Sequence, residues 1–349
     1  MANMDVRTPK FFTDTISFLM SIGTAQNGNF DVVSGSDLIT TYVTGSEAEL
    51  FDMRPMNQVT FNTTASAGVQ ADHVLVTINK QSTNFKTDFI AILNHDMASA
   101  EAKVRVGFGN ALTDVDDVDL ANADNVMANA VEVLNADTIS SNIVTPASNG
   151  STIFTFDATD EQYIGLQFEG MGGAGNLFNG SNNLKIGCII IGEHYTMPHA
   201  PDMSLKRTIV FDGVNVEESL GGQKYANASH LGRRYVNTLN KSPFLTTSYA
   251  SGVYGGRMMY DLSFSYMNSS DVVPTSYGDE VENSDTVIAD IWNRTKGNLL
   301  PFIFSGDSTS AGNKAETNYL FARFAQETLT MKQMSNDVWN INMKIEEEF

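Results

Sequence analysis

Five aspartates lie close together in one stretch of the chain, and their side chains are the ones best placed to do chemistry. They are Asp114, Asp116, Asp117, Asp119 and Asp124. Closely spaced carboxylate oxygens are the ligands that Ca²⁺ prefers. An EF-hand loop counted from Asp114 would need glycine where Asp119 stands, so that motif is excluded. We predict a solvated acidic loop, with a structural calcium site at Asp114, Asp116, Asp117 and Asp119 as the alternative.

The histidines and glycines match no catalytic or cofactor motif. His194 and His199 flank Pro198, beside Glu193, but a metal site would need further ligands on a defined scaffold. The Gly-rich stretch 170–180 lacks the lysine or acidic partner that phosphate-binding loops carry at fixed offsets. The sequence contains no Gly-x-Ser-x-Gly elbow and no His-Glu-x-x-His motif. We therefore predict no catalytic residue and no cofactor, and we do not expect an enzyme.

The single cysteine, Cys188, lies inside an apolar run at 186–191. One thiol excludes an internal disulfide and a Cys-based zinc site. Free cysteine in such a run is usually a small buried hydrophobe. The apolar run 16–22 is short and interrupted by serines, so it fits neither a signal peptide nor a spanning helix. We expect synthesis in a reducing cytoplasm.

Three segments are predicted to position these residues. Residues 1–50 form an N-terminal arm or docking segment, with partial helical spacing at 11–22 and a β-prone run at 37–43. The alternative is that this segment is the first element of the next domain. Residues 51–200 contain short apolar runs bounded by turn residues, which indicates a β-sandwich of jelly-roll type. Its expected strands are 72–78, 89–93, 103–108, 153–156, 163–168 and 184–191. A short helix is expected at 125–134.

Residues 201–349 form a second β-rich domain with one or two short helices. In its clearest strand, 256–266, alternate residues from Met258 to Tyr266 share one apolar face, which is expected to be buried. A helix is predicted over 284–295 with Ser284 as its N-cap. Further strands are expected at 301–304, 319–324, 327–331 and 338–345.

Composition excludes two classes of partner. The chain has 349 residues, with 21 Lys and Arg against 41 Asp and Glu, so its net charge is −20. A phosphate backbone needs a basic face, and an anionic membrane surface would repel this chain. We therefore expect no nucleic-acid binding and no membrane insertion. The low charged fraction of 18% and the abundant Asn, Ser and Thr suit loops that make polar contacts between subunits.

Several short motifs of the second domain follow one another in a specific order. They are 201–210 (PDMSLKRTIV), Gly221–Gly222, 257–266 (RMMYDLSFSY), Trp292, 301–304 (PFIF) with Asp307, 319–324 (YLFARF) and 345–347 (IEE). This order resembles virion structural proteins of tailed bacteriophages, especially tail-tip, distal-tail or adaptor components. Residues 89–95 (FIAILNH) and 103–108 are similar to the galactose-binding-like jelly-roll module often joined to them, with Asn94 and His95 in reversed order.

The resemblance implies a structural role in the virion, in several copies. The leading hypothesis is a tail-tip, baseplate or adaptor ring subunit that acts through multivalent contacts with other virion proteins, as a homo-oligomeric ring or trimer. The alternative is a glycan-binding receptor-recognition module on the virion, because jelly rolls often bind sugars at their loop ends. A third hypothesis is a head-decoration or neck protein of the virion. The expected location is the phage tail, after synthesis in the host cytoplasm.

Overall fold

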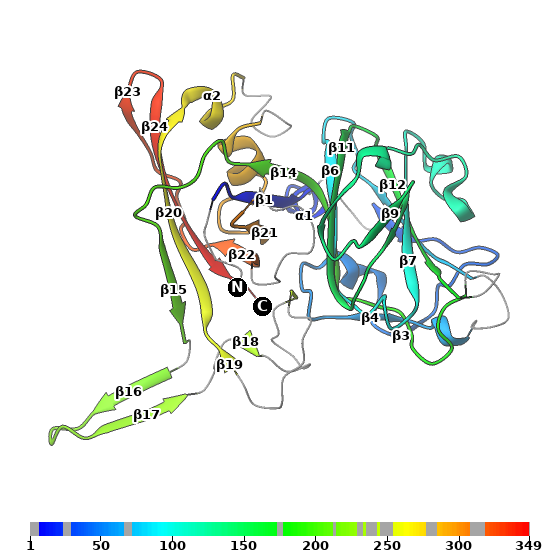
Figure 1. Ribbon diagram of the computed structural model, residues 1–349, viewed down its shortest axis with the longest axis horizontal. Coiled ribbons are helices and arrows are strands. Elements are labelled where there is room, and N and C mark those ends of the chain that lie inside the picture. Colours follow the sequence, from blue (N-terminus) through cyan, green and yellow to red (C-terminus); the bar gives the residue numbers. More distant parts are fainter. Residues whose placement is uncertain are drawn as a thin grey trace.

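The protein is built almost entirely from antiparallel β-sheets, which confirms the predicted fold class (Figure 1). The computed structural model describes residues 7–23, 29–65, 72–172, 177–211, 214–228, 233–234, 243–244, 254–276, 285–307 and 318–348. Its described helices are short: α1 (Thr15–Ser21), α2 (Ser269–Val272), the π-helical η7 (Val287–Asn293), and the 3₁₀ turns η1 (Glu47–Phe51), η2 (Thr63–Ala65), η3 (Leu112–Asp114), η4 (Val118–Leu120) and η5 (Met127–Asn129). Among the described residues, no helix has the length and apolar character needed to span a membrane.

One eleven-stranded sheet runs through the whole molecule. Its order is β15 (Lys206–Val210), β20 (Arg257–Asn268), β24 (Val338–Glu347), β22 (Tyr319–Phe324), β21 (Phe302–Ser305), β1 (Lys10–Asp14), β14 (Cys188–Thr196), β6 (Thr87–His95), β11 (Gly150–Thr159) and β8 (Val131–Leu134), with β23 (Met331–Ser335) paired to β24. Both halves of the chain therefore share one hydrogen-bonded sheet.

Strand β1 joins the two halves. It pairs with β14 of the first half along one edge and with β21 of the second half along the other. Its alternating side chains serve two cores, because Phe11 packs with Phe302 and Phe304 while Phe12 packs with Phe89. The N-terminal segment is thus an integral strand at the centre of the sheet.

The first half is a β-sandwich. Strands β14, β6, β11 and β8 face a six-stranded sheet with the order β2 (Phe30–Val32), β5 (Val74–Asn79), β12 (Tyr163–Gly170), β7 (Ala102–Gly109), β10 (Ile143–Thr145) and β9 (Thr138–Ser140). The main apolar core lies between these sheets, with Ile90 and Phe154 from one and Val106 and Leu166 from the other. A small sheet of β13 (Lys185–Ile186), β4 (Val59–Phe61) and β3 (Tyr42–Thr44) completes this half.

The second half wraps strands β20, β24, β22, β21 and β1 around η7 (Figure 1). Leu262, Phe264 and Ile341 from the strands and Val287 and Ile291 from η7 share one buried cluster. The remaining strands form two small hairpins: β16 (Val214–Glu218) with β17 (Lys224–Ala228), and β18 (Arg233–Arg234) with β19 (Tyr254–Gly255).

Two details of the predicted elements were wrong. Residues 125–134 form the 3₁₀ turn η5 followed by strand β8, because Ala130 takes an extended backbone and β8 pairs with β11. The last-but-one strand begins at Met331 and not at 327. The predicted cap, Ser284, lies outside the described residues, and the hydroxyl of Thr286 accepts the hydrogen bond from the amide of Ala289 at 3.3 Å.

Candidate functional site

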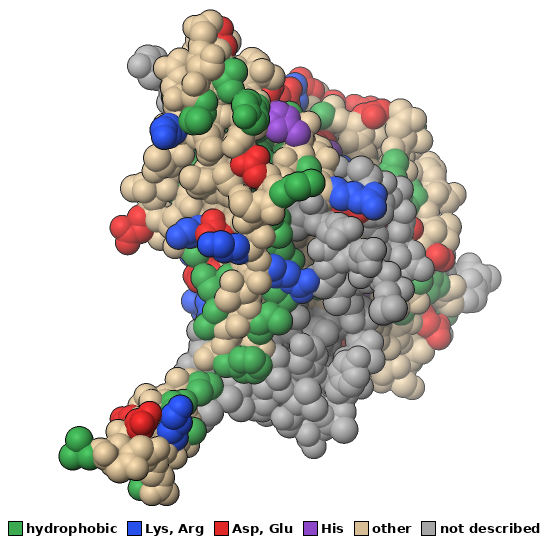
Figure 2. All heavy atoms as spheres, turned by 60° about the vertical axis from the view of Figure 1, so that its left-hand side comes forward, with side chains coloured by type: hydrophobic (Ala, Val, Ile, Leu, Met, Phe, Trp, Pro, Cys, Tyr) green, Lys and Arg blue, Asp and Glu red, His purple; other side chains and the backbone are tan. Residues whose placement is uncertain are grey.

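A two-stranded arm projects from the body of the protein (Figures 1 and 2). It consists of β16 and β17 with their connecting turn, residues 214–228, and it lies beyond the end of the edge strand β15. The turn closes through the amide of Gly222, which donates to the carbonyl of Ser219 at 2.8 Å. Gly222 has φ +80°, a left-handed backbone that favours glycine.

The arm is amphipathic, and its apolar face is open to solvent. Val214 pairs with Ala228 and Val216 with Ala226, so the side chains of Val214, Val216 and Ala226 share one face, while Asn215 and Asn227 share the other. Val216 is 55% exposed, and Leu220 at the tip is fully exposed. An isolated two-stranded hairpin is marginally stable in water and needs packing on one face. The arm therefore has the properties of a surface that packs against another molecule.

The aspartates of the predicted calcium site do not converge. Asp114 accepts a hydrogen bond from the amide of Ala111 at 2.8 Å, and Asp117 accepts one from the amide side chain of Asn122 at 3.1 Å. Asp119 lies 4.0 Å from the guanidinium of Arg105. Within the described ranges, no three His, Cys, Asp or Glu side chains are grouped so that they could hold a metal ion. Calcium binding by Asp114, Asp116, Asp117 and Asp119 stays a prediction.

Close packing holds this acidic loop on the outer face of the sandwich. A Cβ placed on Gly165 would lie 2.7 Å from Leu120 and 3.0 Å from the carbonyl oxygen of Val115. A Cβ on Gly107 would lie 2.5 Å from Ala123. Glycine at these strand positions lets the loop lie directly against the sheet. The loop is thus a fixed, acidic part of the surface.

The loop covers a buried ion cluster on the same face. The carboxylate of Glu169 is fully buried and lies 3.3 Å from the ammonium of Lys103 and 3.2 Å from the guanidinium of Arg105. Gln167 also donates to Glu169, at 3.2 Å. These contacts tie the neighbouring strands β7 and β12 together on this face of the sheet.

The histidines are held separately in the structure. His194 Nδ1 lies 2.8 Å from a carboxylate oxygen of Asp88, and His95 is buried with Nε2 2.7 Å from the hydroxyl of Thr152. Burial lowers the pKa of His95 to about 3, so it is neutral. His230 lies outside the described residues. Cys188 is fully buried, as the sequence predicts, and burial raises the pKa of its thiol.

A second group of acids surrounds Glu193 on β14. Burial, followed by the nearby charges of Asp290 and Asp88, raises the pKa of Glu193 to about 8, and Arg294 opposes this rise. Arg294 itself is almost fully buried, with its guanidinium 4.6 Å from the ring centroid of Phe85. Glu193 is therefore protonated at neutral pH, which ties the stability of this region to pH.

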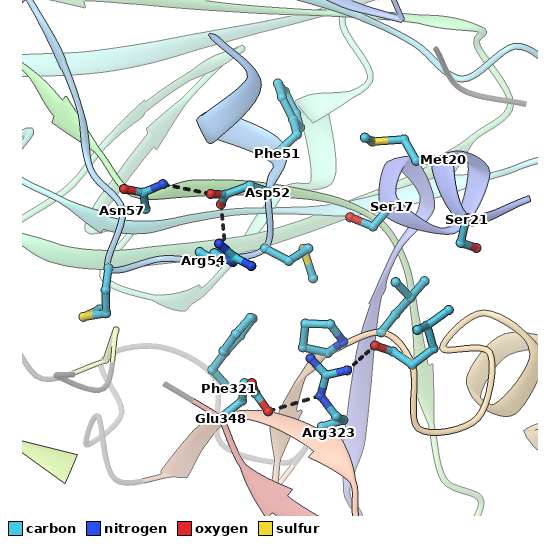
Figure 3. Close-up of a pocket in the computed structure, with 15 residues that line it drawn as sticks. Ser17, Met20, Ser21, Phe51, Asp52, Arg54, Asn57, Phe321, Arg323 and Glu348 are labelled. Carbon is cyan, nitrogen blue, oxygen red and sulfur yellow. Dashed lines mark hydrogen bonds and ion pairs between the residues drawn. The ribbon is translucent and has the colours of Figure 1, made fainter. Parts of the chain in front are cut away.

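A cleft of about 670 Å³ opens where the two halves meet (Figure 3). On one wall, Asp52 accepts hydrogen bonds from the side chain of Asn57 at 3.1 Å and from the backbone amide of Arg54 at 2.7 Å. On the other wall, Arg323 pairs with Glu348 at 3.1 Å and also donates to the carbonyl of Leu299. Figure 3 shows the two walls facing each other. Asp52 is thus held by groups of its own wall, and Arg323 by groups of the opposite one.

Tyr266 on β20 departs from its predicted position. The strand alternation predicts a buried side chain, but Tyr266 is 77% exposed. Ser265 and Tyr266 together stand opposite Asn340 in a β-bulge, because the register of β20 on β24 shifts between Phe264 and Met267. Tyr266 has φ +62°, a strained backbone for a bulky residue. Strain of this kind tends to occur where a side chain is displayed for binding.

Polar groups accompany this displayed ring. Ser265 donates from its hydroxyl to Asp202 at 2.7 Å, and Asn340 donates to the hydroxyl of Ser265 at 3.1 Å. The exposed Tyr266 thus follows directly in the chain on Ser265, whose hydroxyl is held by an amide and a carboxylate. Sequence reasoning missed it, because no signal in the alternation marks the bulge.

Comparisons with known proteins give few likenesses. No family model matches the sequence, and no curated protein matches it. Among solved structures, chitosan-binding module 1 of a chitosanase/glucanase from Paenibacillus sp. IK-5 is 13% identical, with a TM-score of 0.27, covering 47% of this chain and 92% of that one. A truncated AlyQ with CBM32 and alginate lyase domains is 10% identical, with a TM-score of 0.25. The match covers 92% of this chain and 98% of that one.

Proposed function

We propose that this chain is a structural subunit of a larger assembly and acts by binding other protein subunits. The observation that carries the proposal is the projecting arm, whose apolar face, including Val214 and Val216, has no cover within the described part of the chain. Burying such a face against a neighbour removes apolar surface from water and stabilises a hairpin that is marginal alone. The proposal assigns no catalytic step to the chain.

The resemblance of the second half to virion proteins of tailed phages suggests which assembly this is. We propose a tail-tip, baseplate or adaptor ring, in which the subunits contact one another and other virion proteins. In a closed ring each weak contact is repeated, so that modest affinity per contact suffices. The net charge of −20 keeps the free subunit from associating non-specifically before assembly.

Light scattering and negative-stain imaging of the purified chain test this function. We expect a closed ring for the native chain and a monomer for Val216→Asp, which places a charge on the apolar face of the arm. Asn227→Asp is the matched control, because it adds the same charge on the polar face. A native chain that stays monomeric at high concentration, or a Val216→Asp variant that assembles like the native chain, contradicts the proposal.

A second candidate is glycan recognition, and Tyr266 favours it. An exposed aromatic ring offers a sugar a stacking surface, and Tyr266 is 77% exposed. A glycan array probed with the native chain, Tyr266→Ala and Tyr225→Ala tests it, since Tyr225 is a similarly exposed tyrosine on the arm. Binding that is lost only in Tyr266→Ala supports glycan recognition, and a native chain that binds no glycan on the array contradicts it.

A further inference from the structure

The turn at the tip of the arm carries one apolar side chain, and that side chain is fully exposed. It is Leu220, which stands between β16 and β17 in the turn 219–223. The two residues that follow, Gly221 and Gly222, have no side chains that would cover the leucine. Leu220 can therefore enter a hollow surface on another molecule, which would remove its apolar area from water.

The arm also carries charges of both signs next to this tip. Glu218 and Lys224 pair across the hairpin, on the same face as Val216, while Glu217 lies on the opposite face. The residues 214–228 contain two glutamates and one lysine, so their net charge is −1. A surface that receives the tip should therefore be apolar at its centre, with a cation and an anion beside it.

The cleft between the two halves of the chain has an apolar lining of this kind. Its volume of about 670 Å³ lies within the ~300–1,000 Å³ that ligand pockets occupy. Met20 of α1 and Met53 and Met56 of the loop after η1 line it, and methionine adapts its shape to what it contacts. Met20 is 45% exposed, and Leu299 of the opposite wall is 53% exposed. The cleft thus offers open apolar area on more than one wall.

One wall of the cleft carries neighbouring charges of opposite sign (Figure 3). Asp52 accepts the backbone amide of Arg54 at 2.7 Å, and the side chain of Arg54 is exposed. A guanidinium beside a carboxylate is the counterpart of the acid and base at the tip of the arm. Arg54 can meet Glu218 while Asp52 meets Lys224, so a tip that enters the cleft brings unlike charges together.

We propose that the arm of one copy of this chain inserts Leu220 into the cleft of a second copy, between Met20 and Leu299. The inference rests on the proposed assembly function and names the surface of the neighbouring subunit that receives the arm. Arm and cleft are different surfaces, so the contact is heterologous, and repeating it generates a closed ring or an open filament.

The arrangement of the chain favours a second copy as the occupant of the cleft. In its own chain the arm points away from the body that contains the cleft (Figure 1). Every neighbouring copy offers the same cleft at the same concentration as the arm. A different protein with a similar apolar tip is the other occupant, and the experiment below separates it from a second copy.

Variants that damage one surface each test the contact. The arm variant is Leu220→Asp, and the cleft variants are Leu299→Asp and Met20→Asp, which place a carboxylate on two different walls. Leu112→Asp is the matched control, because Leu112 is a similarly exposed leucine, at 46%, on the acidic loop of the sandwich. Sedimentation velocity gives the mass distribution, and melting curves confirm folding. We expect the arm and cleft variants to associate at least tenfold more weakly than the native chain and the control to associate like it.

Mixing the arm variant with a cleft variant is the sharpest form of the test. The cleft of Leu220→Asp and the arm of Leu299→Asp are both intact, so one contact can form between the two chains. We expect equal amounts of these variants, each monomeric alone, to form a dimer and nothing larger.

A disulfide test locates the contact. A chain with both Leu220→Cys and Leu299→Cys should form disulfide-linked multimers on oxidation, whereas either single variant should give nothing longer than a dimer. The buried Cys188 should not interfere.

The outcomes separate this inference from the assembly function. If Val216→Asp and Leu220→Asp abolish assembly while both cleft variants assemble like the native chain, the arm is an assembly surface but this cleft does not receive it. A mixture that stays monomeric also contradicts the contact. If Leu220→Asp leaves self-association intact and weakens only the binding of another protein, a second copy is the wrong occupant. If the native chain stays monomeric at high concentration, both proposals fail.

Discussion

The buried carboxyl of Glu193 makes the stability of this protein depend on pH in a direction opposite to that of most carboxylates. Burial beside Asp290 and Asp88 raises its pKa from 4.5 to about 8. Between these values the folded protein keeps a proton that the unfolded chain releases. The free energy of unfolding therefore falls as the pH rises from about 4.5 through 8.

The magnitude follows from the size of that change in pKa. At ~1.4 kcal/mol per unit, raising the pKa of one carboxyl from 4.5 to about 8 corresponds to roughly 5 kcal/mol between the two ends of the range. Glu193→Gln keeps the size of the side chain but cannot ionise. We expect the variant to match the native protein near pH 4.5 and to exceed its stability by up to roughly 5 kcal/mol above pH 8.

Denaturant unfolding followed by tryptophan fluorescence at several pH values measures this difference. Glu327→Gln is the matched control, because Glu327 is exposed and its removal should leave the pH dependence of the native protein unchanged. Parallel curves of unfolding free energy against pH for the native protein and Glu193→Gln would refute the reasoning.

Three further predictions concern backbone strain, packing and calcium. Tyr266→Gly should be about 1 kcal/mol more stable than Tyr266→Ala in thermal unfolding, because only glycine adopts φ +62° without strain; equal stability would contradict the strained bulge. Gly165→Ala should destabilise the fold by about 1–3 kcal/mol through its contact with Leu120, whereas Gly221→Ala, with only one atom within 4 Å of its Cβ, should be close to neutral in the same assay. If the acidic loop binds calcium, melting temperature should be higher in calcium than in chelator, and Asp117→Asn should remove the increase; identical melting in both buffers would argue against the site.

The strands that the sequence predicted correctly are those whose burial follows their own pattern. Residues 89–93 read as a continuous apolar run and form β6, which is covered on both faces. The strand at 256–266 alternates up to Phe264, as β20 does. In both places, local alternation and tertiary burial agree, which is the condition under which periodicity identifies a strand.

The features that were missed depend on contacts between distant segments. Tyr266 continues the alternation, but the pairing of β20 with β24 inserts a bulge and turns the ring to solvent. Residues 131–134 have partial helical character on their own, and pairing with β11 makes them a strand. The exposed face of the arm has the same Val-x-Val pattern as a buried strand, so its exposure is visible only in the structure.

The position of β1 at the centre of the sheet constrains the order in which the chain can fold during synthesis. Its partner strands, at Cys188–Thr196 and Phe302–Ser305, lie far along the chain. At a synthesis rate of ~5–20 residues per second, β1 stays unpaired for roughly 10–40 s before β14 has been made. The sandwich can close at that point, and it then presents the second edge of β1 as a template for β21. A nascent or truncated chain that stops near residue 200 would leave this edge bare, and bare edges recruit strands from other chains. The second half therefore protects the first from aggregation as soon as it is made.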